Sequence, residues 1–157
     1  MSVREEITGA YLVMPRRLTW AETDAAGHNH FSAGVRWLEE AEHELFHRLG
    51  LVRTVPLLPR VHVELDFRDR IYFGDELTVI AGIISVGRSS ATFGTEVIVG
   101  DETKLEARHT VVHCPEPNGG SGPWPERVKD LLVRYGAVPP REPVLSAVAV
   151  GPVAATR

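Results

Sequence analysis

Residues 18–51 read LTWAETDAAGHNHFSAGVRWLEEAEHELFHRLGL. Apolar side chains recur in the second half of this segment at steps of three or four residues, at Phe31, Val35, Leu38, Ala41, Leu45 and Leu49. Such spacing keeps one face of an α-helix apolar, while Arg, Glu and His side chains occupy the other face. Gly50 follows the last apolar position, where helices commonly end. The pattern predicts one long amphipathic helix that begins after Asn29 and ends near Leu49.

Most of the remaining chain has patterns typical of strands. Apolar and polar residues alternate over residues 61–67, which indicates a strand with one buried face. The apolar run at residues 77–86 predicts a strand that is covered on both faces. We expect further strands within residues 11–20, 91–99 and 104–114, and a short helix over residues 125–135. One long helix followed by a run of strands joined by short turns indicates an α+β fold with an antiparallel sheet.

Length and composition indicate an ordinary globular protein. The chain has 157 residues, of which 43% are hydrophobic and 24% charged, and a formal net charge of −4. Lys and Arg residues form no basic patch, which argues against nucleic-acid binding. Cys114 is the single cysteine, so neither an intrachain disulfide nor a cysteine-based zinc site is expected. With no apolar leader or membrane-spanning run, we expect a cytoplasmic protein with no membrane partner.

The predicted elements divide the chain into three parts. Residues 1–10 are expected to form a loose N-terminal arm, and residues 11–136 the folded domain. Residues 137–157 are rich in Ala, Val and Pro without a clear period, so we expect a flexible C-terminal tail. A single helix cannot cover both faces of such a sheet, and this predicts a homo-oligomer.

The predicted helix contains a motif of zinc hydrolases. His43-Glu44-Leu45-Phe46-His47 matches H-E-x-x-H, in which two imidazoles one turn apart share a zinc ion and the Glu activates water. The third ligand of one zinc-protease group would fall on Arg53, a cation that cannot bind metal. Two histidines on a solvated, charge-rich helix face are therefore the favoured explanation, and a zinc hydrolase is the weaker alternative.

The segment Thr23-Asp24-Ala25-Ala26-Gly27-His28-Asn29 precedes the predicted helix. An ordinary Asp/Gly turn, with Asn29 or a neighbour as the helix N-cap, explains these residues. The same position also suits catalysis, because a carboxylate ahead of a helix N-terminus faces unpaired N–H groups that can polarise a carbonyl. Asp24 would then act as nucleophile or as general base for water. The spacing alone favours the ordinary turn.

A family resemblance bears on this choice. Thr23-Asp24-x-x-Gly27, followed by Val35-Arg36-Trp37-Leu38-Glu39-Glu40-Ala41, resembles the hotdog-fold acyl-CoA thioesterases of the 4-hydroxybenzoyl-CoA thioesterase type. Residues 66–77, 86–90 and 123–132 are similar to later segments of that family in order and spacing. The resemblance covers about residues 16–135. It implies a hotdog fold, in which a curved antiparallel sheet wraps around one long central helix, in a homodimer or homotetramer.

The resemblance also implies a reaction, namely hydrolysis of an acyl thioester of coenzyme A or of an acyl carrier protein, with no cofactor and no metal. In the family, the acid at the Asp24 position is the catalytic carboxylate, and the backbone N–H at the Phe31 position holds the thioester oxygen. Carried over, His30 beside it orients water or the acyl group. A plain helix-start residue exposed to solvent is an equal alternative for His30.

Substrate contacts are expected from Gly27, His28, Asn29, Trp37, Arg88, Ser89 and Ser90. Gly27 permits the turn. Arg88 and the backbone N–H groups of its turn offer donors to the phosphates of coenzyme A, with Arg68 and Arg70 at the same rim. A polar hairpin turn without a ligand is an equal explanation for residues 88–90.

Three positions depart from the family pattern. Many members carry Tyr or His at the Phe31 position, a small polar residue or Asn at Ala33, and Tyr at Gly34. The smaller side chains suggest a roomier pocket, a changed substrate, or the close approach of a neighbouring element, because Gly inside a helix is less favourable than Ala by about 1 kcal/mol. The departures leave a second function open, a hotdog protein that binds an acyl ligand without hydrolysing it.

Overall fold

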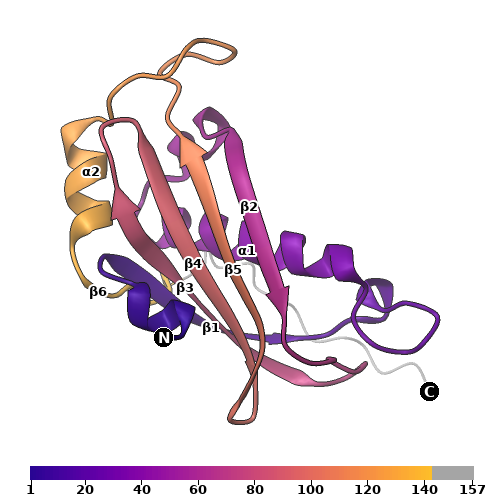
Figure 1. Ribbon diagram of the computed structural model, residues 1–157. Coiled ribbons are helices and arrows are strands. Elements are labelled where there is room, and N and C mark those ends of the chain that lie inside the picture. The colour runs from indigo at the N-terminus through magenta and orange to yellow at the C-terminus, as the bar shows by residue number, and fades with distance from the viewer. Residues whose placement is uncertain (143–157) are drawn as a thin grey trace, which may run out of the picture.

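The computed structural model describes residues 1–142, and in it a six-stranded sheet wraps around one long helix (Figure 1). The strands are β1 (Ala10–Arg17), β2 (Arg60–Phe67), β3 (Glu76–Val86), β4 (Ser90–Val99), β5 (Glu102–Val112) and β6 (Gly136–Ala137). Their order in the sheet is β2-β5-β4-β3-β1-β6. All neighbouring strands are antiparallel except β1 and β6, which are parallel. The predicted α+β fold, with an antiparallel sheet around one helix, is confirmed.

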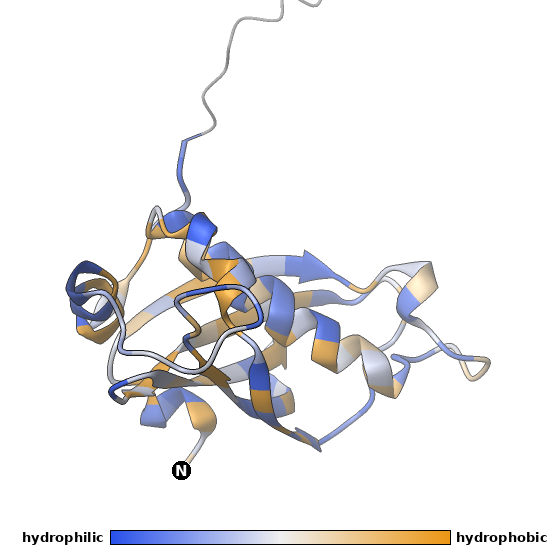
Figure 2. Cartoon of the chain, turned by 90° about the horizontal axis from the view of Figure 1, so that it is seen from above, coloured by the Kyte–Doolittle hydropathy of each residue, from blue (hydrophilic) through white to orange (hydrophobic). Residues whose placement is uncertain are grey.

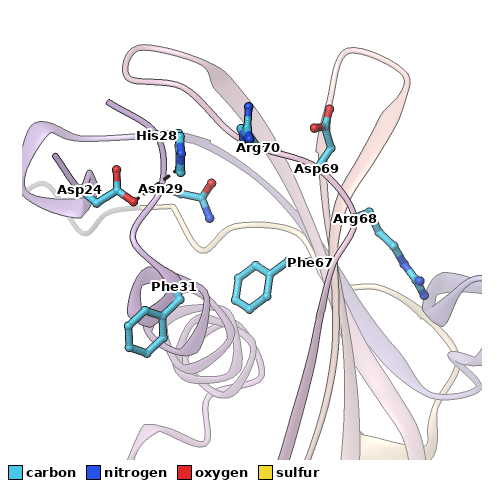
Figure 3. Close-up of a pocket in the computed structure, with 8 residues that line it drawn as sticks. All are labelled: Asp24, His28, Asn29, Phe31, Phe67, Arg68, Asp69 and Arg70. Carbon is cyan, nitrogen blue, oxygen red and sulfur yellow. Dashed lines mark ion pairs between the residues drawn. The ribbon is translucent and has the colours of Figure 1, made fainter. Parts of the chain in front are cut away.

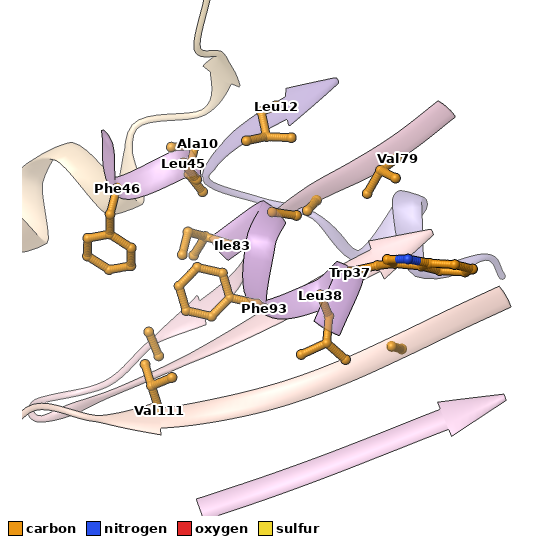
Figure 4. Packing of buried hydrophobic residues seen from close by; sticks show 14 of the residues in the cluster. Ala10, Leu12, Trp37, Leu38, Leu45, Phe46, Val79, Ile83, Phe93 and Val111 are labelled. Carbon is orange, nitrogen blue, oxygen red and sulfur yellow. The ribbon is translucent and has the colours of Figure 1, made fainter. Parts of the chain in front are cut away.

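The central helix α1 (Phe31–Arg48) has the bounds and the apolar face that the sequence predicts. Its fully buried side chains Trp37, Leu38, Ala41, Leu45 and Phe46 pack on the concave face of the sheet (Figure 4). Along α1, hydrophilic segments (blue) alternate with hydrophobic segments (orange), as Figure 2 shows. Each large apolar side chain buried in this way stabilises the fold by about 1.5–3 kcal/mol. This single interface therefore fixes α1 against the sheet.

Gly34 lies where α1 approaches the sheet most closely. A Cβ atom at this position would lie 2.8 Å from Leu105 Cδ1 and 2.8 Å from Leu65 Cδ2. Both distances are shorter than van der Waals contact, so the glycine makes room for the sheet. The idea of a roomier pocket at Gly34 is therefore wrong, and the close approach of a neighbouring element is the correct explanation.

The N-terminal segment covers the opposite face of the sheet. In β4, the ring of Phe93 lies 6.1 Å from the ring of Phe46 in α1, whereas a Cβ at the next residue, Gly94, would meet Val3. Since successive strand residues point to opposite faces, the 3₁₀-helix η1 (Val3–Glu6) lies on the face away from α1. Val3 is fully buried and its N–H donates to Glu106 Oε1 at 2.8 Å. The expectation of a loose arm is wrong for this segment, and β3 is covered on both faces as predicted.

The C-terminal part of the described chain closes the sheet beside β1. The helix α2 (Glu126–Val133) packs against β1 and β3. β6 follows it, and the N–H of Val138 donates to the carbonyl oxygen of Tyr11 at 2.7 Å. Residues 143–157, most of the tail expected over 137–157, lie outside the described residues. Among residues 1–142, no helix is both long enough and apolar enough to cross a membrane.

β2 forms the other edge of the sheet and differs from the expectation. Its apolar side chains Val61, Val63 and Phe67 remain 61%, 38% and 48% exposed, and only Leu65 is half-buried. The prediction that alternation gives β2 a buried face is wrong for the single chain. The reason is that β2 is an edge strand, so no further strand covers it on its outer side.

Candidate active site

The loop before α1 is closed by backbone hydrogen bonds. It follows the 3₁₀-helix η2 (Trp20–Glu22), and the N–H of His30 donates to the carbonyl oxygen of Glu22 at 2.7 Å. Inside this closure, the N–H of Asp24 donates to the carbonyl oxygen of His28 at 2.9 Å. Gly27 turns the chain with φ of +81°, a conformation that side chains with a Cβ rarely adopt. The loop thus returns the chain to the start of α1.

The carboxylate of Asp24 lies at the tip of this loop. One oxygen, Oδ1, accepts a hydrogen bond from the N–H of Ala26 at 2.8 Å. The other, Oδ2, lies 3.6 Å from Nδ1 of His28. A carboxylate has about four acceptor positions, and the side chain is 32% exposed. Asp24 therefore keeps lone pairs available for a bound molecule or water.

The first N–H group of α1 is also available. His30 is the N-cap, since its Nδ1 accepts from the N–H of Ser32 at 3.2 Å, while the N–H of Ala33 donates to the His30 carbonyl oxygen. The N–H of Phe31 has no acceptor among the described residues, as expected for the first turn of a helix. The partial positive charge of the helix terminus adds to its capacity to bind an oxygen atom.

Asp24 and Phe31 line one cavity of about 500 Å³ (Figure 3). The other lining residues are His28, Asn29, Phe67, Arg68, Asp69 and Arg70. The Phe31 side chain is 71% exposed and the Phe67 side chain 48%, so both rings are open to a ligand. The cavity combines the carboxylate of Asp24 with two aromatic residues, and one of these, Phe31, has a backbone N–H without an acceptor among the described residues. Such a set can activate water next to a polarised carbonyl group.

The charged residues after β2 are partly engaged elsewhere. Arg68 extends away from the cavity in Figure 3 and donates twice to Glu106 Oε2, at 3.1 and 2.8 Å. Lys104 donates to Asp69 Oδ2 at 2.7 Å, and this hydrogen bond holds the pKa of Asp69 below its ordinary value. The exposed Arg70 lines the same cavity and adds a positive charge to it.

Of the expected substrate contacts, His28 and Asn29 do line the cavity with Asp24. Asn29 is 9% exposed and has a structural role. Its Oδ1 accepts a hydrogen bond from the N–H of Ile71 at 3.0 Å, and its own N–H donates to the Ile71 carbonyl oxygen at 2.8 Å. The ring of His28 stands edge-on to Tyr72 at 6.3 Å. These contacts attach the Asp24 loop to the segment between β2 and β3.

Two other expected site residues do not line the cavity. Trp37 is fully buried, and its Nε1–H donates to Glu22 Oε1 at 2.9 Å. The prediction that Trp37 contacts substrate is therefore wrong in this chain, because its ring belongs to the core under α1. His30 uses its Nδ1 as the helix cap. This geometry favours the structural alternative for His30 over a catalytic one.

Arg88, Ser89 and Ser90 form the turn between β3 and β4, at the far end of β3 from Asp24. β3 has 11 residues, and at about 3.3 Å per residue this separates the two sites by roughly 33 Å. The backbone N–H of His113 donates to the Ser89 carbonyl oxygen. The ring N–H of Trp124 donates to the Ser90 carbonyl oxygen. A single chain therefore does not bring residues 88–90 together with Asp24, contrary to the expectation.

Two side chains of the H-E-x-x-H motif, His43 and Glu44, are bonded to arginines. Arg60 donates to His43 Nε2 at 3.1 Å, so a cation lies where a metal ion would bind. Arg48 donates to Glu44 Oε1 at 2.7 Å, and His47 is exposed. Within residues 1–142, no three His, Cys, Asp or Glu side chains gather as a metal site requires. The geometry disfavours the zinc alternative.

Sequence reasoning missed two residues of the cavity, Phe67 and Asp69. Phe67 was assigned to the buried face of its strand because it follows the apolar alternation of β2. A single sequence carries no signal that β2 is an edge strand, and therefore none that this ring is exposed. The position of Asp69 depends on the path of the chain after β2, which has no local motif.

A curved sheet wrapped around one long helix is the architecture of the hotdog fold, and the cavity that Asp24 and Phe31 line lies at the start of that helix. Residues 26–106 match the thioesterase superfamily, and the chain belongs to this family. Among solved structures, a 1,4-dihydroxy-2-naphthoyl-CoA thioesterase from Synechocystis is similar, with a TM-score of 0.71 and 22% identity over 78% of this chain and 95% of that chain. At this identity, the likeness confirms the fold.

Two curated relatives carry the name 1,4-dihydroxy-2-naphthoyl-CoA hydrolase. One from Synechococcus sp. strain CC9311 is 35% identical over 45% of this chain and 55% of the relative. Another from Synechococcus sp. strain CC9605 is 27% identical over 69% of this chain and 86% of the relative. The chain spans about half the length of the first relative that it matches. The family rests on the match of residues 26–106, and the activity of this chain is a separate question.

Proposed function

We propose that the protein hydrolyses an acyl thioester of coenzyme A, with Asp24 as the catalytic carboxylate and the Phe31 N–H as the donor to the thioester oxygen. The observation that supports this most directly is that one cavity is lined both by Asp24, whose side chain is 32% exposed, and by Phe31, whose N–H has no acceptor among the described residues. An acyl carrier protein is the alternative carrier of the acyl group. The names of the curated relatives favour coenzyme A.

Two routes through Asp24 lead to the same products. As general base, the carboxylate takes a proton from water while the water oxygen attacks the thioester carbon. As nucleophile, its oxygen attacks that carbon and forms a mixed anhydride, which water then hydrolyses. In both routes the Phe31 N–H stabilises the oxyanion, the carbon–sulfur bond breaks, and the sulfur leaves as the thiolate of coenzyme A and takes up a proton.

The acyl group that best fits the cavity is an aromatic one. The exposed rings of Phe31 and Phe67 offer flat apolar surfaces, and aromatic pairs are worth about 0.5–1.5 kcal/mol beyond the area that they bury. The two relatives are named for a bicyclic aromatic acyl group. The guanidinium of Arg70, a residue that lines the cavity, suits the phosphates of coenzyme A.

The functional form that we propose is a homodimer that pairs through β2. This edge strand presents free backbone groups together with the exposed apolar side chains Val61, Val63 and Phe67. Exposed edge strands with apolar side chains readily pair with another chain. Two copies of one strand meeting about a twofold axis run antiparallel and bury the same surface twice. Such pairing would enclose the open side of the cavity, where Phe31 and Phe67 lie. A homotetramer would pair two such dimers.

Turnover on a panel of acyl-CoA thioesters tests the proposal. The panel contains short aliphatic, long aliphatic and aromatic acyl groups, with free thiol measured as the product. The expected result is turnover that is greatest for aromatic acyl groups. Absence of turnover on every CoA thioester and on acyl carrier protein thioesters, together with tight binding of an aromatic acyl-CoA, would instead establish the ligand-binding alternative.

A further inference from the structure

The side chain of Glu22, two residues before Asp24, is the most heavily bonded carboxylate near the cavity. Arg16 donates to it in a bidentate manner, from Nη2 at 2.5 Å and from Nη1 at 2.8 Å. The ring N–H of Trp37 donates to Oε1 at 2.9 Å. The N–H and the hydroxyl of Thr19 both donate to Oε2 at 2.9 Å. Glu22 therefore joins the end of β1, η2 and α1.

Arg16 extends this cluster along α1. Its Nε donates to Glu40 Oε2 at 2.8 Å and its Nη2 donates to Glu40 Oε1 at 3.0 Å. The guanidinium carbon lies 5.6 Å from the centre of the Trp37 ring, within the range of a cation–π contact. Glu22, Arg16, Thr19, Trp37 and Glu40 together are called the Glu22 cluster. Planar bidentate contacts of this kind fix orientation as well as distance.

The centre of the cluster is shielded from water, whereas Thr19 and Glu40 at its border are exposed. The side chains of Glu22 and Arg16 are 11% and 16% exposed, and Trp37 is fully buried. Burial alone would raise the pKa of Glu22, but hydrogen bonds from Arg16, Thr19 and Trp37 outweigh it and lower this pKa to about 2. The neighbouring pair Arg17–Glu76 is 2.9 Å long but 68% and 80% exposed. Both pairs join an Arg to a Glu. The Arg16–Glu22 pair is buried and bonded to α1, whereas the Arg17–Glu76 pair is exposed.

The Asp24 loop is held to residues 71–73 on one side, where the N–H of Phe73 donates to the Gly27 carbonyl oxygen at 3.3 Å, and to the start of α1 at its ends. A Cβ on Gly27 would have no atom within 4 Å, and Asp24 Oδ1 bonds only within the loop, to the N–H of Ala26. The carbonyl oxygen of Glu22 accepts from the N–H of His30 and so closes the loop. Glu22 therefore has two roles. Its side chain is bonded to Trp37 of α1, and its backbone carbonyl sets the distance from Asp24 to the start of this helix.

We propose that Glu22 and Arg16 are positioning residues, which hold the Asp24 carboxylate and the Phe31 N–H at the spacing that the reaction requires. This inference rests on the proposed thioesterase function. Neither side chain lines the cavity, so neither touches the substrate. They act through Asp24, by fixing both ends of the loop that carries it.

Steady-state kinetics of Glu22→Gln, which keeps the size of the side chain and removes its charge, test the inference. Displacement of a catalytic group by about 1 Å can lower a rate 100-fold, so we expect kcat to fall about 10- to 100-fold. KM stays within about threefold, since the lining residues are unchanged. The matched control is Glu76→Gln, the same substitution in the exposed partner of Arg17, which leaves kcat unchanged. An equal loss in both variants would overturn the inference.

A double variant separates positioning from general damage. If Glu22 acts only through Asp24, adding Glu22→Gln to Asp24→Asn lowers the residual rate no further, because residues that act as a unit are non-additive. A further fall in the double variant, equal to that in the single variant, would overturn the inference. Arg16→Lys serves as a second variant if Glu22→Gln does not fold, since it keeps the charge and loses the bidentate contact.

Hydrogen exchange gives a readout that needs no activity. In Glu22→Gln we expect the amides of Asp24 and His30 to exchange about tenfold faster, while amides of β4 stay unchanged. Unchanged exchange in the loop would refute the positioning role even if turnover falls. If the wild type hydrolyses no thioester, the proposed function fails, and faster exchange confined to this loop would still establish that the Glu22 cluster positions it.

Discussion

The backbone N–H of His30 donates to the carbonyl oxygen of Glu22 at 2.7 Å, and this bond closes the Asp24 loop at the start of α1. The Asp24 carboxylate belongs to the loop between Glu22 and His30, and the Phe31 N–H follows directly after this loop. Their relative position is thus a local property of about ten residues, fixed to the core through Trp37. The predictions below test separate parts of this account.

Removal of metal is predicted to leave activity unchanged. His43 accepts a hydrogen bond from Arg60, and the nearby carboxylate of Glu44 is held by Arg48. We expect His43→Ala and wild-type protein treated with a chelator to keep their turnover within about twofold. His47→Ala, which changes an exposed residue of the same motif, is the matched control. Loss of activity on chelation that added zinc restores would contradict this prediction.

A larger side chain at Gly34 is predicted to destabilise the protein. Even a Cβ at this position would lie 2.8 Å from side-chain atoms of Leu65 and Leu105. Overpacking of this kind lowers the free energy of unfolding by about 1–3 kcal/mol, so Gly34→Leu should show such a loss in urea unfolding. Val35→Leu, on the exposed side of α1, is the control. Equal stability of both variants would show that α1 and the sheet are further apart.

The contribution of Glu22 to stability is predicted to depend on pH. Because its pKa is lowered in the folded state from 4.5 to about 2, its contribution is fully present above pH 4.5 and is lost as pH falls towards 2. The difference in unfolding free energy between wild type and Glu22→Gln should therefore be larger at neutral pH than at pH about 3. Urea unfolding at both pH values measures it. A difference that does not change with pH, or an equal change in Glu76→Gln, would argue against this role.

A charge on the edge strand is predicted to prevent dimer formation. Val63 is 38% exposed on β2, where the proposed partner strand lies. Burying an unpaired Lys is strongly unfavourable, so Val63→Lys should be monomeric by light scattering at a concentration where the wild type is dimeric. Val52→Lys changes an exposed valine outside the sheet and should not alter the mass. A wild-type monomer, or a dimeric Val63→Lys, would contradict pairing through β2.

Periodic patterns in the sequence predict most of the fold. The spacing of apolar residues places α1 within one residue of its observed ends, because the helix has one strongly apolar face. The hairpin between β4 and β5 follows from Gly100, whose φ is +64°. Local chemistry is enough for such elements.

Long-range packing is what the sequence does not predict. The burial of Val3 depends on Gly94, ninety residues away, which leaves space on the far face of the sheet. Trp37 was expected in the pocket because it lies on the helix, but its ring N–H finds an acceptor in Glu22. The exposure of Phe67 follows from the strand order. Each of these depends on which elements become neighbours in space.

The direct test of the central claim is single-turnover hydrolysis of an aromatic acyl-CoA by wild type and by Asp24→Asn, with Glu76→Gln as the control. The substitution keeps the size of the side chain and removes the basic oxygen, so the melting temperature should change little. We predict that the hydrolysis rate falls by at least about 100-fold, because a general base alone contributes about 10²–10⁴-fold. A folded Asp24→Asn protein that hydrolyses the thioester at the wild-type rate would contradict the account.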